Sequence, residues 1–469
     1  MVFSSTLFLF IFFPVTILGY YLIPGRAKNY WLLALSLVFF GWLQPQFLWV
    51  ILFNVCINYF GAILIHRFPD HKKLFLVLAI AFNLAVLFYY KYLNFTVLTI
   101  NQIFGSDIVL DKILMPIGIS FFTFQGLSYV IDVYRKQVSV QKNPFKVALF
   151  IVLFPQLIAG PIVRYKDIAA EIEKRRAGLG DFGSGIERFI IGLAKKTILA
   201  NSFAVIVDAI WMNGAGESTW IIAWIGSVAY TLQIYFDFSG YSDMAIGLGR
   251  MFGFHFNENF NYPYTASSIS EFWRKWHISL SSWFRDYVYI PLGGNRKHVY
   301  LNLFLVFLLT GIWHGAAWNF LLWGLWHCAF ILIERVIRMH SSGEKKRGTI
   351  RTIVLKLYTL FVVNIGWVLF RAPDLKEAWE YLRSMFGLTA AEHVGFTPGW
   401  FLDRWNIAAF VIGILAASSL PVFLSGKLKK LIPETGLKIA KYVVLLLLFY
   451  FSITQIVSGT YNPFIYFRF

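Results

Sequence analysis

Long apolar stretches recur along the whole of this 469-residue chain, and they restrict its possible folds more than any other feature. A straight helix needs about 20 apolar residues to cross a bilayer, and several of the stretches are shorter than that. The pattern predicts an all-α polytopic membrane protein with about 10–12 transmembrane helices, some of them broken or re-entrant, together with interfacial helices. The apolar stretches cover residues 3–21, 30–42, 47–65, 74–87, 113–130, 220–236, 299–312, 320–333, 353–369, 407–423 and 442–456.

Charge is scarce and unevenly placed. Charged residues make up 14% of the chain, against about 25% in a soluble globular domain. The net charge of +18 would suggest a nucleic-acid partner in a soluble protein. Here the basic residues gather in short loops at 71–73, 174–176 and 345–347, which is typical of cytosolic helix ends that meet anionic headgroups. We therefore expect membrane lipids, and no nucleic acid, as partners.

The N-terminal stretch has no basic segment before it and no small-residue cleavage pattern after it, so it is expected to remain as a membrane anchor. Arg26 and Lys28 follow it closely, which places the N-terminus outside the cytosol. Cys56 and Cys328 both lie in apolar stretches, so neither a disulfide framework nor a thiolate metal site is predicted.

No Pro-, Ser- or Gly-rich linker divides the chain, and it contains no internal repeat. The polar stretches at 161–185, 253–297, 340–351 and 390–405 are too short to form independent domains. We therefore predict a single membrane domain over residues 1–469, richest in motifs between 230 and 330. A large polymeric substrate would have to be handled by another protein or at the membrane surface.

Residues 268–290 differ from the apolar stretches. Ser268 and Glu271 have the spacing of a helix capping box, and Pro291 is expected to end the segment. As one helix, the segment would carry its aromatic residues in a sector of about 120°. This favours a helix at or dipping into the membrane interface, with His277 on the border between its faces.

Three of the nine histidines lie in membrane-type segments: His277, His314 and His327. Ionisable side chains are costly in a membrane, so a functional role is the first hypothesis for His277 and His314. The alternatives for His314 are a structural hydrogen bond between helices and a metal ligand, although no histidine spacing typical of a metal site supports the latter. His327 is most simply a packed and hydrogen-bonded histidine outside the chemistry.

His314 lies near the middle of an apolar stretch between two basic pairs, Arg296 with Lys297 and Arg335 with Arg338. If both basic ends are cytosolic, the stretch forms a helical hairpin with His314 near its turn. At about 1.5 Å per residue, His314 then lies about 25 Å from the cytosolic face. A histidine at that depth suits a reaction that connects the two sides of a membrane.

The stretch "YFDFSGYSDMAIGLG" carries Asp237 and Asp243 among aromatic and small residues. Its small residues, Ser239 among them, would let a neighbouring helix approach closely. The two carboxylates need cationic partners at this depth, and Arg250 or Arg274 are candidates. Structural ion pairs and a substrate tunnel explain them equally well.

The candidate residues fit one chemistry better than others. A histidine with an ordinary pKa near roughly 6.5 can act as a general base on a hydroxyl. An activated thioester would then supply the acyl group. The sequence contains no Walker-type phosphate-binding motif that would indicate an ATP-driven pump.

At these residues the sequence resembles the membrane-bound O-acyltransferase family, and within it the branch of alginate O-acetyltransferase membrane subunits. The resemblance spans nearly the whole chain. It is carried by "MPIGISFFTFQGLSYVIDVYR", "FPQLIAGPIVRY", "YTLQIYFDFSGYSDMAIGLG", "ENFNYPY", "SISEFWRKWHISLSSWFRDYVYIPLGGN", "LTGIWHGAAWNFLLWGLWH" and "YNPFIYFRF".

The resemblance implies a ring of tilted helices around a thin centre, with a tunnel that admits acyl-CoA from the cytosol. The family's catalytic histidine falls on His314 and its second active-site position on His277. The branch implies a bacterial inner-membrane protein that takes acetyl groups from acetyl-CoA as substrate, with no tightly bound cofactor and no metal. A membrane-tethered or periplasmic SGNH-type acetyltransferase would receive them and modify an exported polysaccharide such as alginate.

On this hypothesis acetyl-CoA docks at the cytosolic face, and His314 deprotonates the acceptor hydroxyl or takes the acetyl group transiently. His277 orients a substrate or shares the proton. Further candidates for binding the substrate or coenzyme A are Arg274, Lys275, Arg285, Asp237, Ser239 and Trp313.

Three other functions remain open. D-alanyl transfer to teichoic acid would use the same fold with a carrier protein as donor. A proton-coupled transporter would use His314 as a proton relay without consuming acetyl-CoA. A scaffold of a secretion complex would not need His314 for its function.

Overall fold

The computed structural model describes residues 1–212, 214, 218–340, 348–389, 397–459, 463 and 465. The basic loop 345–347 and most of the C-terminal motif "YNPFIYFRF" lie outside these residues, as do the side chains of residues 338–340. The described residues form helices and connecting loops without a β-strand, which confirms the all-α class. They divide into two compact units, residues 1–189 with 241–258 and residues 190–240 with 259–469. The expectation of a single membrane domain stays a prediction.

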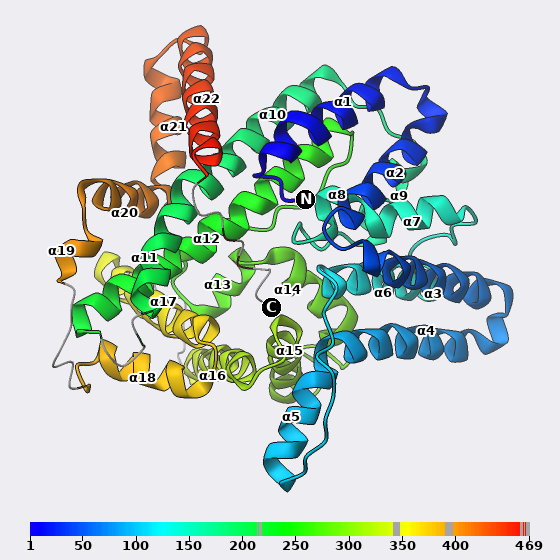
Figure 1. Ribbon diagram of the computed structural model, residues 1–469, viewed down its shortest axis with the longest axis horizontal. Coiled ribbons are helices and arrows are strands. Elements are labelled where there is room, and N and C mark those ends of the chain that lie inside the picture. Colours follow the sequence, from blue (N-terminus) through cyan, green and yellow to red (C-terminus); the bar gives the residue numbers. More distant parts are fainter. Residues whose placement is uncertain are drawn as a thin grey trace. The chain divides into compact units, whose positions relative to one another are not determined.

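In the first unit, α3, α4 and α6 pack side by side (Figure 1). α6 is the most buried of the three along its length, because α3, α4, α7 and α9 all pack against it. The helices of the first unit are α1 (Phe13–Leu22), α2 (Lys28–Gly41), α3 (Leu48–Arg67), α4 (Lys72–Leu87), α5 (Leu93–Phe104), α6 (Ile119–Tyr134), α7 (Pro144–Val152), α8 (Phe154–Leu157), α9 (Tyr165–Glu173) and the first part of α10 (Leu179–Ala194).

The second unit holds an extensive apolar core, to which most helices from α11 to α18 contribute, with many tryptophan and phenylalanine rings. Within it, α15 and α16 form the closest helix pair. Its helices are α11 (Asn201–Met212), the first part of α12 (Trp220–Met251), α13 (Ile269–Lys275), α14 (Ile278–Phe284), α15 (Val299–His314), α16 (Trp318–His340), α17 (Thr349–Arg371), α18 (Leu375–Met385), α19 (Pro398–Phe401), α20 (Arg404–Ala417), α21 (Leu420–Leu431) and α22 (Glu434–Val457).

The described chain contains 7 helices that are long and apolar enough to cross a membrane, or up to 8 if the bent pair α20–α21 is one span. This confirms a multi-pass membrane protein. The number is below the predicted ten to twelve because several apolar stretches form helices that are too short. Two apolar helices of this kind are Phe8–Leu22 and Val299–His314. The stretch 113–130 becomes helical only from Ile119, as α6.

One candidate span, Leu179–Met212, was not predicted from the sequence. Its charged residues interrupt the apolar pattern, and two of them pair with the carboxylates of α12. In the first unit, Arg188 lies 2.6 Å from Asp243. In the second unit, Lys196 lies 2.7 Å from Asp237, and each of these side chains is only 2% exposed. The proposed partners Arg250 and Arg274 were therefore wrong.

Small residues bring α10 and α12 close together, as predicted for this motif. A Cβ atom on Gly247 would lie 2.6 Å from the carbonyl oxygen of Gly185 in the first unit. In the second unit, a Cβ on Gly240 would lie 2.7 Å from the carbonyl oxygen of Gly192. Neither position leaves room for a side chain, so these glycines set the spacing that the ion pairs bridge.

The predicted hairpin around His314 is confirmed. α15 ends at His314, α16 begins at Trp318, and the two helices pack along their lengths. Gly311 and Gly324 allow the close approach, because a Cβ on either would lie within 2.5 Å of a carbonyl oxygen of the other helix. His314 thus sits at the turn between the two helices.

The prediction of one helix over 268–290 was wrong. Ser268 caps α13 by accepting a hydrogen bond from the Glu271 amide, as expected. The helix then breaks at Trp276 and His277, and the chain continues as α14 and a short π-helical turn, Arg285–Tyr289. The aromatic sector is buried against the protein instead of facing the interface, and Trp273 packs on Phe307 and Trp323.

Candidate active site

The two histidines selected from the sequence come together in the second unit. The ring centroids of His277 and His314 are 6.3 Å apart, although the residues lie far apart in sequence and on different elements. His277 is fully buried and His314 is 5% exposed. Trp313 is next to both, with its ring centroid 6.0 Å from His277 and 5.0 Å from His314. The predicted group His277, Trp313 and His314 therefore exists as a cluster.

His277 adopts a left-handed backbone conformation, with φ of 45°. A non-glycine residue in this region is strained by about 1–3 kcal/mol, and such strain is concentrated at functional sites. The conformation interrupts the predicted helix and directs His277 away from the face that a continuous helix would give it.

Aromatic rings enclose the imidazole of His314. The rings of Trp323 and Phe370 stand edge-on to it, with centroids 4.9 Å and 5.1 Å away. Trp323 and Phe370 belong to α16 and α17, so three helices, α15 to α17, define the surroundings of this histidine. Such an enclosure keeps bulk water away from the site.

His327 lies one turn beyond Trp323 on α16 and is fully buried. Its ring packs against Trp273 and Trp323, with centroids 5.2 Å and 5.3 Å away. Packing was therefore predicted correctly. The predicted hydrogen bond was wrong, because neither ring nitrogen has a hydrogen-bond partner among the described residues.

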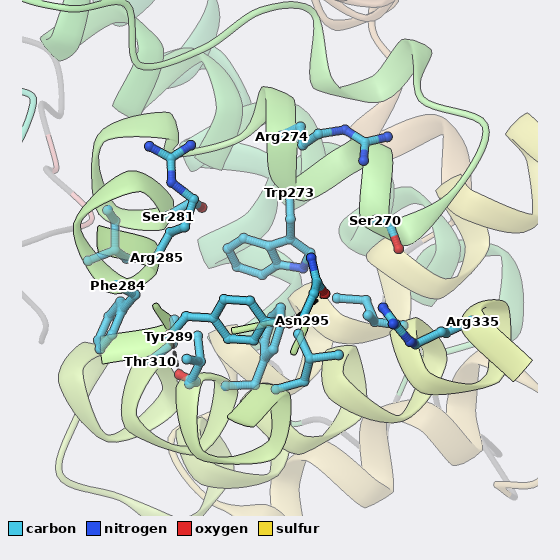
Figure 2. A pocket seen from close by; sticks show the side chains of 15 residues that line it. Ser270, Trp273, Arg274, Ser281, Phe284, Arg285, Tyr289, Asn295, Thr310 and Arg335 are labelled. Atoms are coloured by element: carbon cyan, nitrogen blue, oxygen red, sulfur yellow. Dashed lines mark hydrogen bonds between the residues drawn. The ribbon is translucent and has the colours of Figure 1, made fainter. Parts of the chain in front are cut away.

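A cavity of about 620 Å³ lies among α13, α14, the π-helical turn, α15 and α16 in the same unit (Figure 2), and neither His277 nor His314 lines it. This volume lies within the range of small-molecule binding sites, roughly 300–1,000 Å³. Arg274, Arg285 and Arg335 reach it from α13, the π-helical turn and α16. Thr310 also lines it and precedes His314 by one turn of α15, or about 6 Å along the axis.

Apolar side chains also line the cavity. They come from α13 to α16 and are Trp273, Leu280, Phe284, Leu303, Val306, Phe307 and Ile331. The cavity therefore combines cationic groups with an apolar lining, and its Thr310 lies one turn from His314 on α15.

The remaining predicted binding residues are placed differently. Lys275 does not line the cavity, since its ammonium group lies 2.8 Å from Glu271 and donates to Thr265. Burial disfavours the charged carboxylate of Glu271, but hydrogen bonds from Lys275 and Ser267 prevail and lower its pKa to about 2. Asp237 and Ser239 are buried in α12 and do not line the cavity either.

Glu334 of α16 fixes the start of α13. Its two carboxylate oxygens accept hydrogen bonds from the amides of Ile269, at 2.5 Å, and Ser270, at 3.1 Å. A negative charge at a helix N-terminus is favourable because the first amides point toward it. Glu334 thereby ties α13, which carries Trp273 and Arg274, to the helix that carries Arg335.

Sequence reasoning missed Arg335 and Asn259 as site residues. Arg335 was visible only as part of a basic pair at a helix end. Asn259 belongs to the motif "ENFNYPY", and its side chain contacts His277. Among the described residues, no group of three or more His, Cys, Asp or Glu side chains is arranged to hold a metal ion.

The family model of the membrane-bound O-acyltransferase family matches residues 122–370, which include both histidines and the cavity. The chain belongs to the membrane-bound O-acyltransferase family.

Several relatives of known name are similar over most of the chain. A protein named probable alginate O-acetylase AlgI, from Azotobacter vinelandii, is 40% identical over 507 residues and covers 100% of both chains. The peptidoglycan O-acetyltransferase of Helicobacter pylori is 35% identical, and the matched region covers 89% of this chain and 86% of the relative's length. The teichoic acid D-alanyltransferase of Bacillus subtilis is 32% identical over a shorter region, which covers 43% of this chain and 54% of the relative's length.

Proposed function

We propose that this O-acyltransferase is the membrane subunit of a polysaccharide O-acetylation system in a bacterial inner membrane. It takes acetyl groups from cytosolic acetyl-CoA and passes them across the membrane to a partner acetyltransferase of the SGNH type. That partner then acetylates an exported polysaccharide such as alginate. The similarity to an alginate O-acetylase and to a peptidoglycan O-acetyltransferase supports acetyl transfer to a bacterial polymer.

The observation that carries the proposal is a single cavity lined both by three arginines and by Thr310, which lies one turn of α15 from His314. Coenzyme A has a highly anionic nucleotide and a long pantetheine arm. Arginine is the preferred residue for phosphate because its planar guanidinium donates several hydrogen bonds. The apolar lining suits the pantetheine arm, which would carry the thioester toward His314.

The enclosed His314 provides the general base of the proposed reaction. His314 accepts the proton of the acceptor hydroxyl as its oxygen attacks the thioester carbonyl. A carbon–oxygen bond forms, the carbon–sulfur bond breaks, and the proton passes from His314 to the leaving thiolate of coenzyme A. An acetyl group carried for a moment on His314 gives the same overall balance.

The test is the transfer of radiolabelled acetyl groups from acetyl-CoA in membranes that contain the chain and its candidate partner. His314→Ala should lower the rate by at least about 100-fold, because general base catalysis contributes roughly 10²–10⁴-fold. His255→Gln is a matched control, since His255 is half-exposed and pairs with Glu171 and Asp181 in the other unit. Equal transfer by wild type and His314→Ala would show that His314 is structural.

The same membranes separate the remaining alternatives. A D-alanyl carrier protein should not replace acetyl-CoA as donor. If it does, and acetyl-CoA does not, the chain is a D-alanyl transferase. Transport of a substrate with no transfer from either donor would instead indicate a proton-coupled transporter.

A further inference from the structure

The contacts of Asn259 bear directly on the chemistry of the second histidine. Asn259 lies between α12 and α13 and is 1% exposed. Its side-chain oxygen accepts hydrogen bonds from the amide of Ser279, at 3.1 Å, and from the Ser279 hydroxyl, at 2.9 Å. The same oxygen lies 3.2 Å from Nδ1 of His277. The backbone oxygen of Asn259 also accepts a hydrogen bond from the amide of Ile278.

These contacts determine which way the carboxamide of Asn259 points. Oxygen and nitrogen of an asparagine side chain are distinguished by their hydrogen-bond partners. The backbone amide of Ser279 can only donate, so the atom that faces it must be the oxygen. The opposite orientation would bring two N–H groups together. The Ser279 hydroxyl lies 3.5 Å from Nδ1 of His277, but its hydrogen goes to the nearer Asn259 oxygen at 2.9 Å. Nδ1 of His277 therefore faces two oxygen acceptors, which favours a hydrogen on Nδ1.

The protonation of the other nitrogen then follows. Burial lowers the pKa of His277 to about 3, so the ring is neutral and carries a single N–H. With that hydrogen on Nδ1, Nε2 has a free lone pair. Nε2 is buried and has no hydrogen-bond partner among the described residues. The rings that face His277 belong to Phe238, Trp313 and His314, and of these only His314 titrates.

We propose that Asn259 is a positioning residue that fixes the tautomer of His277, so that Nε2 presents a hydrogen-bond acceptor to the reaction centre at His314. This inference rests on the proposed acetyl transfer for its catalytic meaning. His277 then accepts a hydrogen bond from the acceptor hydroxyl or from His314 and does not donate one. Asn259 also holds the strained turn at His277 from both its backbone and its side chain, which explains how the left-handed conformation persists.

The first test reads the tautomer directly and needs no activity. In full-length protein with ¹⁵N-labelled histidine in lipid, solid-state NMR distinguishes protonated from unprotonated ring nitrogens, and comparison with His277→Gln identifies the signals of His277. The wild type should show Nδ1 protonated and Nε2 unprotonated. Asn259→Ala should lose this preference, whereas Asn259→Asp should keep it because a carboxylate accepts the same hydrogen bonds. A wild-type spectrum with Nε2 protonated would overturn the proposal.

The second test measures acetyl transfer at matched amounts of folded protein. Loss of a correct tautomer lowers the turnover of histidine-based enzymes by up to about 10⁴-fold, and loss of acid–base function by roughly 10²-fold or more. Asn259→Ala should therefore reduce kcat at least about tenfold with KM for acetyl-CoA within roughly twofold. Asn259→Asp should recover most of the rate.

Asn364→Ala is the matched control, because Asn364 is a buried asparagine of the same unit that donates to Thr231. If both alanine variants lose the same activity, or if Asn259→Asp gives no recovery, Asn259 is only structural. Absence of transfer by the wild type would contradict the proposed function, whereas the NMR result would still decide the tautomer.

Discussion

At the scale of single residues, the three arginines of the cavity are the feature that most needs a ligand. Like charges repel, and among the residues that the structure describes the only ion pair of these arginines joins Arg285 to its neighbour Asp286 at 2.8 Å. Arg335 comes from α16 and Arg274 from α13, so two separate elements bring cations to one space. A bound polyphosphate would relieve this repulsion, and each charge-assisted hydrogen bond contributes about 1.5–3 kcal/mol.

Arg335→Gln should therefore raise KM for acetyl-CoA roughly tenfold or more and leave kcat nearly unchanged, because the lost hydrogen bond holds the donor equally in the ground and transition states. Steady-state transfer over a range of acetyl-CoA concentrations measures both constants. Lys275→Gln is the matched control, since Lys275 pairs with Glu271 outside the cavity. An equal increase in KM for both variants would remove Arg335 from the binding site.

The sequence was sufficient to find His277, His314 and Trp313 because a polar or bulky residue beside apolar stretches is visible without a structure. Arg274 and Arg285 were also found, and they share the cavity. The sequence could not find Asn259, whose role depends on a contact with a residue 18 positions away. Lys275 does not line this cavity, and only the fold shows that its charge is paired with Glu271.

At the scale of helices, the pairing of Lys196 with Asp237 explains why one transmembrane helix escaped detection. Lysine in an apolar stretch lowers its hydropathy, yet here its charge meets a carboxylate of the neighbouring helix at 2.7 Å. The backbone amide of Ile465 donates to the same carboxylate, at 2.8 Å, and the backbone oxygen of Pro463 accepts from Lys196. A hydropathy pattern treats each residue alone, so it cannot recognise charges that are compensated by another element.

Asp237→Asn should destabilise the protein strongly, by about 3–5 kcal/mol, because it leaves Lys196 buried without its counter-charge. Thermal unfolding of the detergent-solubilised protein would detect the loss. Glu434→Gln serves as control, since Glu434 and Lys438 form an exposed pair on α22, and such a pair contributes about 0–1 kcal/mol. The double replacement Lys196→Met with Asp237→Leu should recover much of the stability. A small effect of Asp237→Asn would mean that water or another group compensates Lys196.

At the scale of the whole molecule, the proposed reaction requires that the arginines face the cytosol. The sequence set this orientation only as a condition, that both basic ends flanking the α15–α16 hairpin are cytosolic, and the structure confirms the hairpin alone. A long span of the first unit allows a separate topology prediction from its own sequence. The span Pro69–Phe104 has 36 residues, or about 54 Å at ~1.5 Å per residue, well beyond the roughly 30 Å of a hydrocarbon core. It begins at basic residues, so we expect its start in the cytosol and the loop after α5 outside.

Two single cysteines test this orientation, with Cys56 replaced by serine because it is exposed and Cys328 retained because it is buried. Asn295→Cys marks the exposed rim of the cavity, and Val109→Cys marks the loop after α5, where Val109 is 91% exposed. A membrane-impermeant maleimide should label position 295 only in inverted vesicles and position 109 only in right-side-out vesicles. Labelling of 295 from the outside would place the arginines away from cytosolic acetyl-CoA. The donor would then have to be an extracytoplasmic anion, and the proposed direction of acetyl transfer would be wrong even if His314 proved catalytic.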